Sequence, residues 1–238
     1  MLPSAERPAL HLSDGAIEAL KWFALILMTA DHINKYLFNA TLPVAFEAGR
    51  LSLPIFIMVL AYNLSRPHMM QGNRQLHVAG RLVIFGLLAS IPFVALGGLR
   101  HGWYPLNVLF TLCVITLVVH QLEQHTAHSR RNALLLFLVG GSFVEYWWPG
   151  IALGVSTWRY LTRPSRLSAS MVLLSSASLW FINGNFWAMA AVPIFLIASH
   201  LSVDLPRVRW AFYSYYPLHL AALWLIRIPM RNAGHLFL

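Results

Sequence analysis

The sequence predicts an all-α fold, a polytopic bundle of helices that is integral to a membrane. Of its 238 residues 58% are hydrophobic and only 11% are charged, whereas about a quarter of the residues in a soluble domain are charged. Apolar runs close to or above the roughly 20 residues that cross a bilayer recur almost to the C-terminus. These runs predict one transmembrane domain at 16–228, preceded by an N-terminal segment (1–15) and followed by a tail (229–238).

Apolar runs separated by polar breaks predict about nine helices. In chain order we expect them at 17–38, 50–65, 76–97, 106–122, 132–148, 150–161, 168–182, 186–200 and 211–228. The first follows a segment without the basic start and small-residue cleavage site of a secretory signal, so it should remain as an anchor. The run 150–161 is too short to cross unless it is buried in protein or forms a re-entrant half-helix after Trp148-Pro149-Gly150.

The distribution of arginine predicts the topology. Nine crossings place four connecting loops on one side, and these carry most of the arginines: Arg66, Arg74, Arg130, Arg131, Arg163, Arg166, Arg207 and Arg209. The opposite loops contain only Arg100 before the tail adds Arg231. Because basic loops stay in the cytoplasm, we expect a cytoplasmic N-terminus and a C-terminus on the periplasmic or extracellular side.

Composition also excludes several classes of function. The net charge is +9, but the basic residues are scattered singly between apolar runs, which argues against nucleic acid as a partner. Cys113 is the single cysteine, which rules out an internal disulfide and a zinc site built on thiolates. The eleven histidines show no pairs at matching depth for haem, and we expect no metal cofactor.

A cluster of polar residues interrupts the first expected helix. Asp31, His32, Asn34 and Lys35 follow one another within three turns, and such groups inside a membrane mainly face polar cavities. Lys21, Met28, His32 and Lys35 recur at helical spacing and should form one stripe that lines an interior passage. At 1.5 Å per residue, His32 lies roughly 20 Å from the cytoplasmic start of the helix.

Each candidate residue has a functional and a structural interpretation. His32 can act as a base, a nucleophile or a ligand, or it can be a histidine hydrogen-bonded between helices. Asp31 can pair with Lys35 one turn on. Arg50 can be an interfacial anchor, or a partner of Asp31 or of an oxyanion opposite His32. Glu145, beside three aromatic residues, is expected at the interface.

The arginines of the cytoplasmic side allow two interpretations. The positive-inside rule alone explains Arg74 and Arg81. Alternatively these residues form a basic mouth for a phosphorylated ligand, with Arg159 and Arg163 as its far wall, because guanidinium groups grip phosphate in two-pronged fashion. Asn107 and His219 are further polar groups among apolar neighbours.

Five segments together resemble one family. They are Leu20-Lys21 through Asp31-His32, Gly49-Arg50 with Pro54-Ile55-Phe56, Gly80-Arg81-Leu82, Leu106-Asn107-Val108-Leu109-Phe110 and Tyr216-Pro217-Leu218-His219-Leu220. In this order they resemble the signatures of the TraX family, over about residues 16 to 228. That family takes its name from the conjugation protein that acetylates the N-terminus of F-type pilin, and it is similar to membrane acyltransferases that modify surface polysaccharides.

The resemblance implies an acetyltransferase of the bacterial inner membrane. Acetyl-CoA from the cytoplasm would be the donor, and the acceptor would be a pilin amine or an envelope glycan or lipid at the membrane or outer face. His32 would be the general base or a transient acetyl carrier. Asp31 would set the local electric field, and Arg50 and Asn107 would stabilise the oxyanion. The phosphates of CoA would be bound by Arg81, Arg74 and Arg163. The acceptor side of the cavity would be formed by Tyr216, His219, Asn34 and Lys35.

Two other classes of function stay open at this stage. A proton-coupled transporter or lipid flippase could relay protons through Asp31, His32 and Lys35, although the sequence shows no inverted repeat. A non-enzymatic scaffold for pilus or envelope assembly would tolerate His32→Ala. The transporter predicts no effect of CoA on stability, whereas an acetyltransferase should be stabilised by it.

Overall fold

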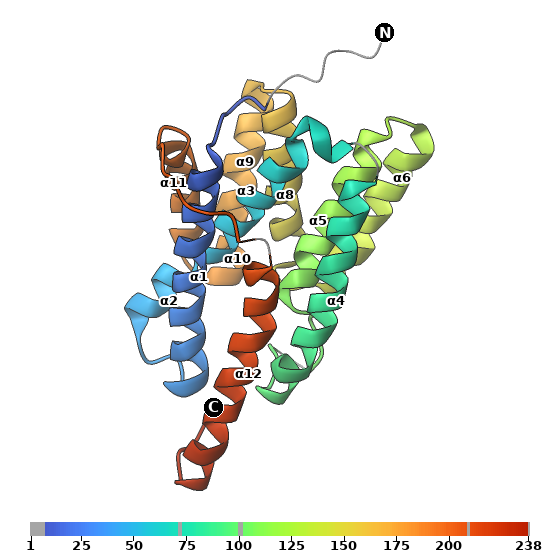
Figure 1. Cartoon of the computed structure of the whole chain (residues 1–238). Coiled ribbons are helices and arrows are strands. Elements are labelled where there is room, and N and C mark those ends of the chain that lie inside the picture. Colours follow the sequence, from blue (N-terminus) through green and yellow to red (C-terminus); the bar gives the residue numbers. More distant parts are fainter. Residues whose placement is uncertain (1–7, 71–72, 100–101, 209, 238) are drawn as a thin grey trace.

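The computed structural model describes residues 8–70, 73–99, 102–208 and 210–237, and these residues form a bundle of helices (Figure 1). Within the described ranges there is no β-strand, only an isolated bridge between Leu106 and Val144. The all-α prediction is therefore confirmed for this part of the chain. By length and composition, two described stretches suit a membrane crossing, Pro43–Ser65 and Arg74–Ala95.

The helices fall into a few packed groups. In chain order they are α1 (Asp14–Leu37), α2 (Pro43–Gly49), α3 (Ser52–Ser65), η1 (Pro67–Met70), α4 (Arg74–Ala95), α5 (Val108–Glu123), α6 (Ala127–Leu135), η2 (Leu136–Gly140), α7 (Gly141–Phe143), α8 (Trp147–Thr162), α9 (Arg166–Ser178), α10 (Trp180–Asn183), η3 (Trp187–Ala190), α11 (Ala191–Ala198) and α12 (Ala211–Asn232). Helix α3 packs between α1 and α8, and α4 packs between α5 and α12. The interior of the bundle is thus enclosed by α1, α3, α4, α5 and α12.

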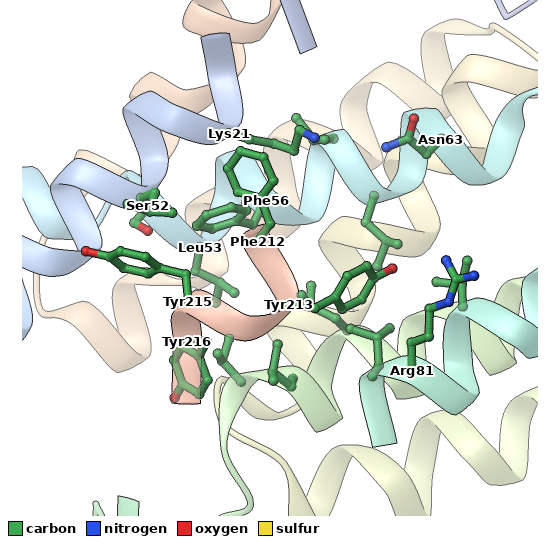
Figure 2. Close-up of a pocket in the computed structure, with 18 of the residues that line it drawn as sticks. Lys21, Ser52, Leu53, Phe56, Asn63, Arg81, Phe212, Tyr213, Tyr215 and Tyr216 are labelled. Atoms are coloured by element: carbon green, nitrogen blue, oxygen red, sulfur yellow. The ribbon is translucent and has the colours of Figure 1, made fainter. Parts of the chain in front are cut away.

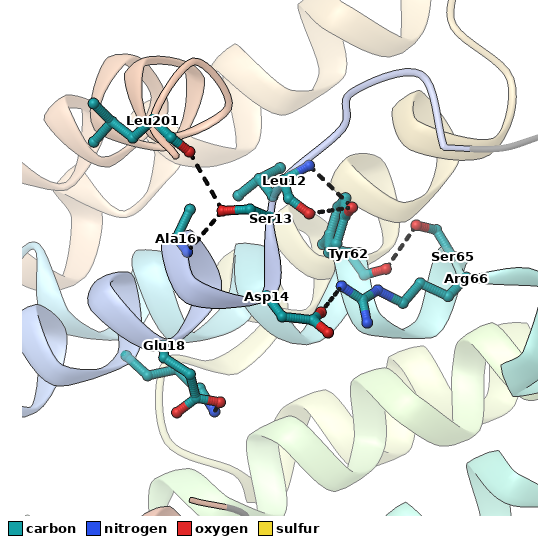
Figure 3. A network of polar contacts seen from close by, with 10 residues as sticks. Leu12, Ser13, Asp14, Ala16, Glu18, Tyr62, Ser65, Arg66 and Leu201 are labelled. Atoms are coloured by element: carbon teal, nitrogen blue, oxygen red, sulfur yellow. Dashed lines mark hydrogen bonds and ion pairs between the residues drawn. The ribbon is translucent and has the colours of Figure 1, made fainter. Parts of the chain in front are cut away.

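The start of α1 is fixed to the end of α3 (Figure 3). Ser13 caps the helix by accepting a hydrogen bond from the Ala16 amide at 3.1 Å, which satisfies one of the free amides of a first turn. The Tyr62 hydroxyl accepts from the Leu12 amide at 3.0 Å and donates to the Leu12 carbonyl at 3.1 Å. Arg66 binds Asp14 at 2.7 Å. These contacts hold the entry of α1 beside the link that leads to α4.

Several expected helices have different limits in the structure. The expected helix 132–148 ends at Phe143, because Leu106 donates its amide to Phe143 and accepts from the Glu145 amide, which draws Val144 into extended backbone. The expected helix 168–182 is divided into α9 and α10, and 186–200 starts as the 3-10 turn η3. Helix α8 has 16 residues and packs against α3, α5 and α9, so the short run is buried in protein. Helix α12 continues past 228 to Asn232.

The segment after α11 lies over the start of α1. A Cβ on Gly15 would meet the Val203 carbonyl oxygen at 1.7 Å, so the two backbones touch at this glycine. Ser13 also donates to the Leu201 carbonyl at 3.3 Å. The segment then descends into the bundle, and Figure 1 shows α12 starting part-way along it.

Replacing Gly15 with alanine should displace the 201–208 segment, because the added methyl overlaps backbone atoms that cannot rotate away. We expect a loss of about 2 kcal/mol in the free energy of unfolding, seen as a lower melting temperature of the purified protein. Gly80→Ala is the matched control, since nothing lies within 4 Å of its Cβ position and alanine favours a helix. Equal melting temperatures for Gly15→Ala and the unmodified protein would contradict this packing.

Candidate functional site

A cavity of about 640 Å³ occupies the interior of the bundle. Its lining comes mainly from α1, α3, α4, α5 and α12. Gly49 of α2, His68 and Met69 of η1, and the connecting residues Glu145, Tyr146 and Arg207 complete it. Figure 2 shows Lys21, Asn63 and Arg81 around one part of it, and Ser52, Tyr215 and Tyr216 around another. One continuous space therefore connects cationic side chains to the polar residues of α1.

One stripe of α1 lines this cavity. Lys21, Leu25, Met28 and His32 all face it, together with Asp31, so the predicted helical stripe is confirmed over these positions. Lys35 is not among the described lining residues. Its amine lies 4.8 Å from the centre of the Tyr36 ring and 3.5 Å from the Tyr36 hydroxyl. The passage therefore includes His32 but not the lysine one turn further along.

His32 is paired with a second histidine. Its Nδ1 lies 2.7 Å from Nε2 of His219, and the two rings are within 2° of parallel. His219 in turn places its Nδ1 3.0 Å from the Tyr215 carbonyl oxygen. The rings of Tyr36 and Tyr216 pack on His32 at centroid distances of 5.7 and 6.3 Å. His219 does not itself line the cavity within the described residues, so it lies behind His32 and not on the wall where we expected it.

Asp31 and Arg50 form an ion pair between α1 and the link from α2 to α3. Arg50 also donates through Nε to the Phe46 carbonyl at 3.1 Å, and its guanidinium lies 4.3 Å from the Phe46 ring centre. Gly49 makes the pair possible, because a Cβ there would lie 2.4 Å from Cβ of Asp31. The predicted partnership of Asp31 with Arg50 is thus present, and the salt bridge of Asp31 is to Arg50, not to Lys35.

Glu145, expected at the membrane interface from the sequence, lies in the cavity wall. Its Oε2 is buried and has no hydrogen-bond partner among the described residues. The bridge between Leu106 and Val144 ends α7 early and turns the chain inward at this point. A carboxylate within an apolar run was the one sequence feature that could have indicated a site at Glu145. The bridge that turns it inward joins residues far apart in the chain, so the local sequence pattern could not predict it.

The opposite part of the cavity is strongly basic. Its wall contains His68, Arg74, His77, Arg207, Lys21 and Arg81. Lys21 binds Glu18 and lies 4.1 Å from the Phe212 ring centre, while Arg81 lies 5.1 Å from that of Trp210. The first turn of α12 therefore lies between two cations. Burial first, and the neighbouring arginines second, lower the pKa of His68 below its usual value.

Besides Lys35, His219 and Arg50, three further expected site residues are not among the described lining residues. Asn107 is fully buried; its side chain accepts from the Leu109 amide and donates to the Gly86 carbonyl and the Ser90 hydroxyl. Asn34 is also fully buried and exchanges two hydrogen bonds with the backbone of Leu42. Arg163 ends α8 and is not among the described lining residues. The side-chain amides of Asn107 and Asn34 therefore bind backbone groups and do not face the cavity, which corrects the roles expected for them in the site.

Two further observations concern metals and the unplaced arginines. No group of three or more histidine, cysteine, aspartate or glutamate side chains could hold a metal ion in the described part of the chain. Cys113 is buried and its thiol lies 3.8 Å from the Ala79 carbonyl oxygen, which is a packing position. Arg100 and Arg209 lie outside the described residues.

The sequence of the whole bundle matches one protein family. A family profile described as "TraX protein" matches residues 16–227. The chain belongs to the TraX family. "Protein TraX" of Escherichia coli is 29% identical over 225 residues, covering 89% of this chain and 87% of the relative. "Protein TraX" of Escherichia coli strain K12 is 31% identical over 130 residues, covering 54% of this chain and 49% of the relative. No solved structure matches the chain.

The TraX match spans the cavity from its first helix to its last. Helices α1 and α12, which carry His32 and His219, lie almost wholly within residues 16–227. The resemblance noted from the five sequence segments is therefore confirmed at the level of the family. Three of those segments supply the ion pair at Arg50, the cation at Arg81 and the histidine at position 219.

Removing one member of the Asp31–Arg50 pair should cost this TraX-family protein more stability than removing both charges. Both side chains are only 14% exposed, and an isolated buried charge costs about 3–5 kcal/mol. We expect Arg50→Met to lower the melting temperature markedly, and the double variant Asp31→Asn with Arg50→Met to recover part of the loss. Strictly additive losses in this double-mutant cycle would show that the pair is not coupled.

Proposed function

We propose that this TraX-family protein is a membrane-embedded acetyltransferase that uses cytoplasmic acetyl-CoA as donor. The acceptor is an amine or hydroxyl at the membrane or its outer face, such as the N-terminal amine of a pilin or an envelope glycan or lipid. One observation carries the proposal. A single cavity joins a cluster of basic side chains to an imidazole that is held between two helices.

The surface and the arrangement of charge support a membrane position. Four large apolar side chains of α4 are exposed to between 50% and 64%: Ile84, Leu87, Leu88 and Ile91. Such a continuous apolar face suits lipid, and α4 is one of the two stretches of sufficient length and hydropathy. In our proposal the bundle crosses the bacterial inner membrane several times, with the basic end in the cytoplasm and the C-terminus on the other side.

The dimensions of the cavity suit the donor. Lys21 and His32 are eleven residues apart on α1, which corresponds to about 16 Å along the helix axis. The pantetheine arm between the pyrophosphate and the thioester sulfur has about thirteen bonds and extends to about 16 Å. A pyrophosphate at Lys21 and Arg81 therefore brings the acetyl carbonyl to the level of His32.

The remaining phosphate of the donor has its own cations. Arg74, His68 and Arg207 lie further toward the basic end than Arg81, which is seven residues or about 10 Å along α4 from Arg74. Guanidinium groups bind phosphate with two parallel hydrogen bonds. Of the three arginines expected at CoA phosphates, the proposal keeps Arg81 and Arg74, and it places Arg207 where Arg163 was expected.

The chemistry at the other end is acyl transfer with His32 as general base. The imidazole accepts a proton from the acceptor amine or hydroxyl while the acceptor atom attacks the thioester carbonyl carbon. The tetrahedral intermediate then breaks its bond to sulfur, and the imidazolium returns the proton to the CoA thiolate. Arg50 is bound to Asp31 outside the cavity wall, so it acts on the reaction through its electric field. Glu145, in the wall, offers an oxygen that can accept a hydrogen bond from the acceptor.

Acetyl-CoA and CoA should stabilise the purified protein, because a ligand that binds only the folded state adds about 2.7 kcal/mol at one hundred times its dissociation constant. Arg81→Met and Lys21→Met should each raise the ligand concentration needed for the same shift in melting temperature at least tenfold. Arg163→Met is the matched control, as an arginine from the same end of the bundle that lies outside the cavity. A melting temperature indifferent to CoA would reject the donor proposal and favour a transporter.

His32→Gln should lower the transfer of labelled acetyl groups from acetyl-CoA to membranes of the native cells by about 10²–10⁴-fold, the usual contribution of a general base. The stabilisation by acetyl-CoA should persist, since the phosphate-binding residues remain. His200→Gln, a histidine exposed after α11, should transfer acetyl groups normally. Undiminished transfer by His32→Gln would exclude the imidazole as the base.

A further inference from the structure

We propose that His219 is a positioning residue that fixes the tautomer of His32, so that the unprotonated nitrogen of His32 is Nε2 and faces the cavity. The inference rests on the proposed acetyl transfer for its consequence, but its physical content is independent of any activity. It concerns a residue one layer behind the wall, which touches neither donor nor acceptor. Two hydrogen bonds, one within α12 and one between α12 and α1, and the position of the remaining ring nitrogen carry it.

The first contact determines where the proton of His219 lies. Nδ1 of His219 is 3.0 Å from the Tyr215 carbonyl oxygen, and a carbonyl oxygen only accepts hydrogen bonds. Nδ1 of His219 must therefore carry a proton. In a neutral imidazole the other nitrogen then has a free lone pair, so Nε2 of His219 is an acceptor.

The second contact transmits this choice to His32. Nε2 of His219 lies 2.7 Å from Nδ1 of His32, and the rings lie within 2° of parallel. Because the His219 nitrogen accepts, Nδ1 of His32 must donate and carries the proton of that ring. For two neutral rings this is the single arrangement that satisfies both hydrogen bonds.

The third observation concerns the remaining nitrogen of His32. His32 lines the cavity, and Nε2 makes no hydrogen bond within the described residues. Because Nδ1 is taken by His219, Nε2 is the ring nitrogen that is left for the cavity. The lone pair that a general base requires is thus presented where the acceptor must lie.

The arrangement matters because the other tautomer would be inactive as a base. With its proton on Nε2, His32 would present a donor to the cavity and turn its lone pair toward His219. The backbone carbonyl of Tyr215 cannot change its role, so α12 holds the chain of hydrogen bonds in one direction. Second-layer groups commonly orient catalytic and metal-binding histidines in this way.

The direct test is nitrogen NMR of the purified protein labelled with ¹⁵N-histidine, at a pH where histidine is neutral. Protonated and unprotonated ring nitrogens have well-separated shifts, and His32→Gln and His219→Gln samples assign the two rings. We expect His32 protonated on Nδ1 in the unmodified protein. A His32 protonated on Nε2 would overturn the proposal, whether or not the protein transfers acetyl groups.

A kinetic test distinguishes positioning from packing. His219→Met should lower kcat for acetyl transfer by about 10²-fold with KM for acetyl-CoA unchanged, because the donor site is intact. His219→Glu restores an acceptor and should recover part of kcat. His120→Met is the control for losing a hydrogen-bonded histidine outside the cavity, since His120 pairs with Gln75 at 3.0 Å; its kcat should be unchanged.

Two outcomes would separate the inference from the proposed function. Unchanged kcat in His219→Met would overturn the positioning role while leaving the acetyltransferase intact. No transfer by any variant or by the unmodified protein would reject the proposed function, and the NMR result would then still decide the tautomer.

Discussion

The structure depends on one constraint, that polar side chains inside an apolar bundle must be paired or must face a cavity. On α1 both solutions occur along one helix. Asp31 is neutralised by Arg50, Glu18 binds Lys21, and His32 shares a hydrogen bond with His219. Each pairing ties α1 to another element or leaves a polar atom toward the cavity. The position of α1 in the bundle is therefore set by the same residues that give the cavity its chemistry.

Much of the site was predictable because it depends on helical periodicity. Lys21, Met28 and His32 share a face by their spacing alone, and the structure places all three in the wall. Glu145 was not predictable in this way, because its place depends on a bridge to Leu106, far along the chain. Asn107 carried a readable signal that pointed to structure: an asparagine directly before an apolar run is a favoured helix N-cap, and the structure uses it as one.

The arginines of the basic end show why composition cannot separate topology from binding. Arg163 and Arg207 lie in loops that the sequence places on the same side, and both satisfy the positive-inside rule. Only Arg207 lines the cavity. The difference comes from the segment after α11, which crosses α1 at Gly15 and turns into the bundle. A contact between backbones separated by almost the whole chain thus accompanies the place of Arg207 in the cavity wall.

The start of α12 contributes to the cavity wall. Interiors of proteins are close-packed and contain few open volumes larger than a water molecule. Helix α12 begins part-way along the bundle, and the residues of its first turns line the cavity. Trp210, directly before α12, and Phe212, in its first turn, contact Arg81 and Lys21. His219, two turns after Phe212, forms a hydrogen bond with His32. One helix thus sets both the position of the cations and the direction of the imidazole, at a separation fixed by its own rise per residue.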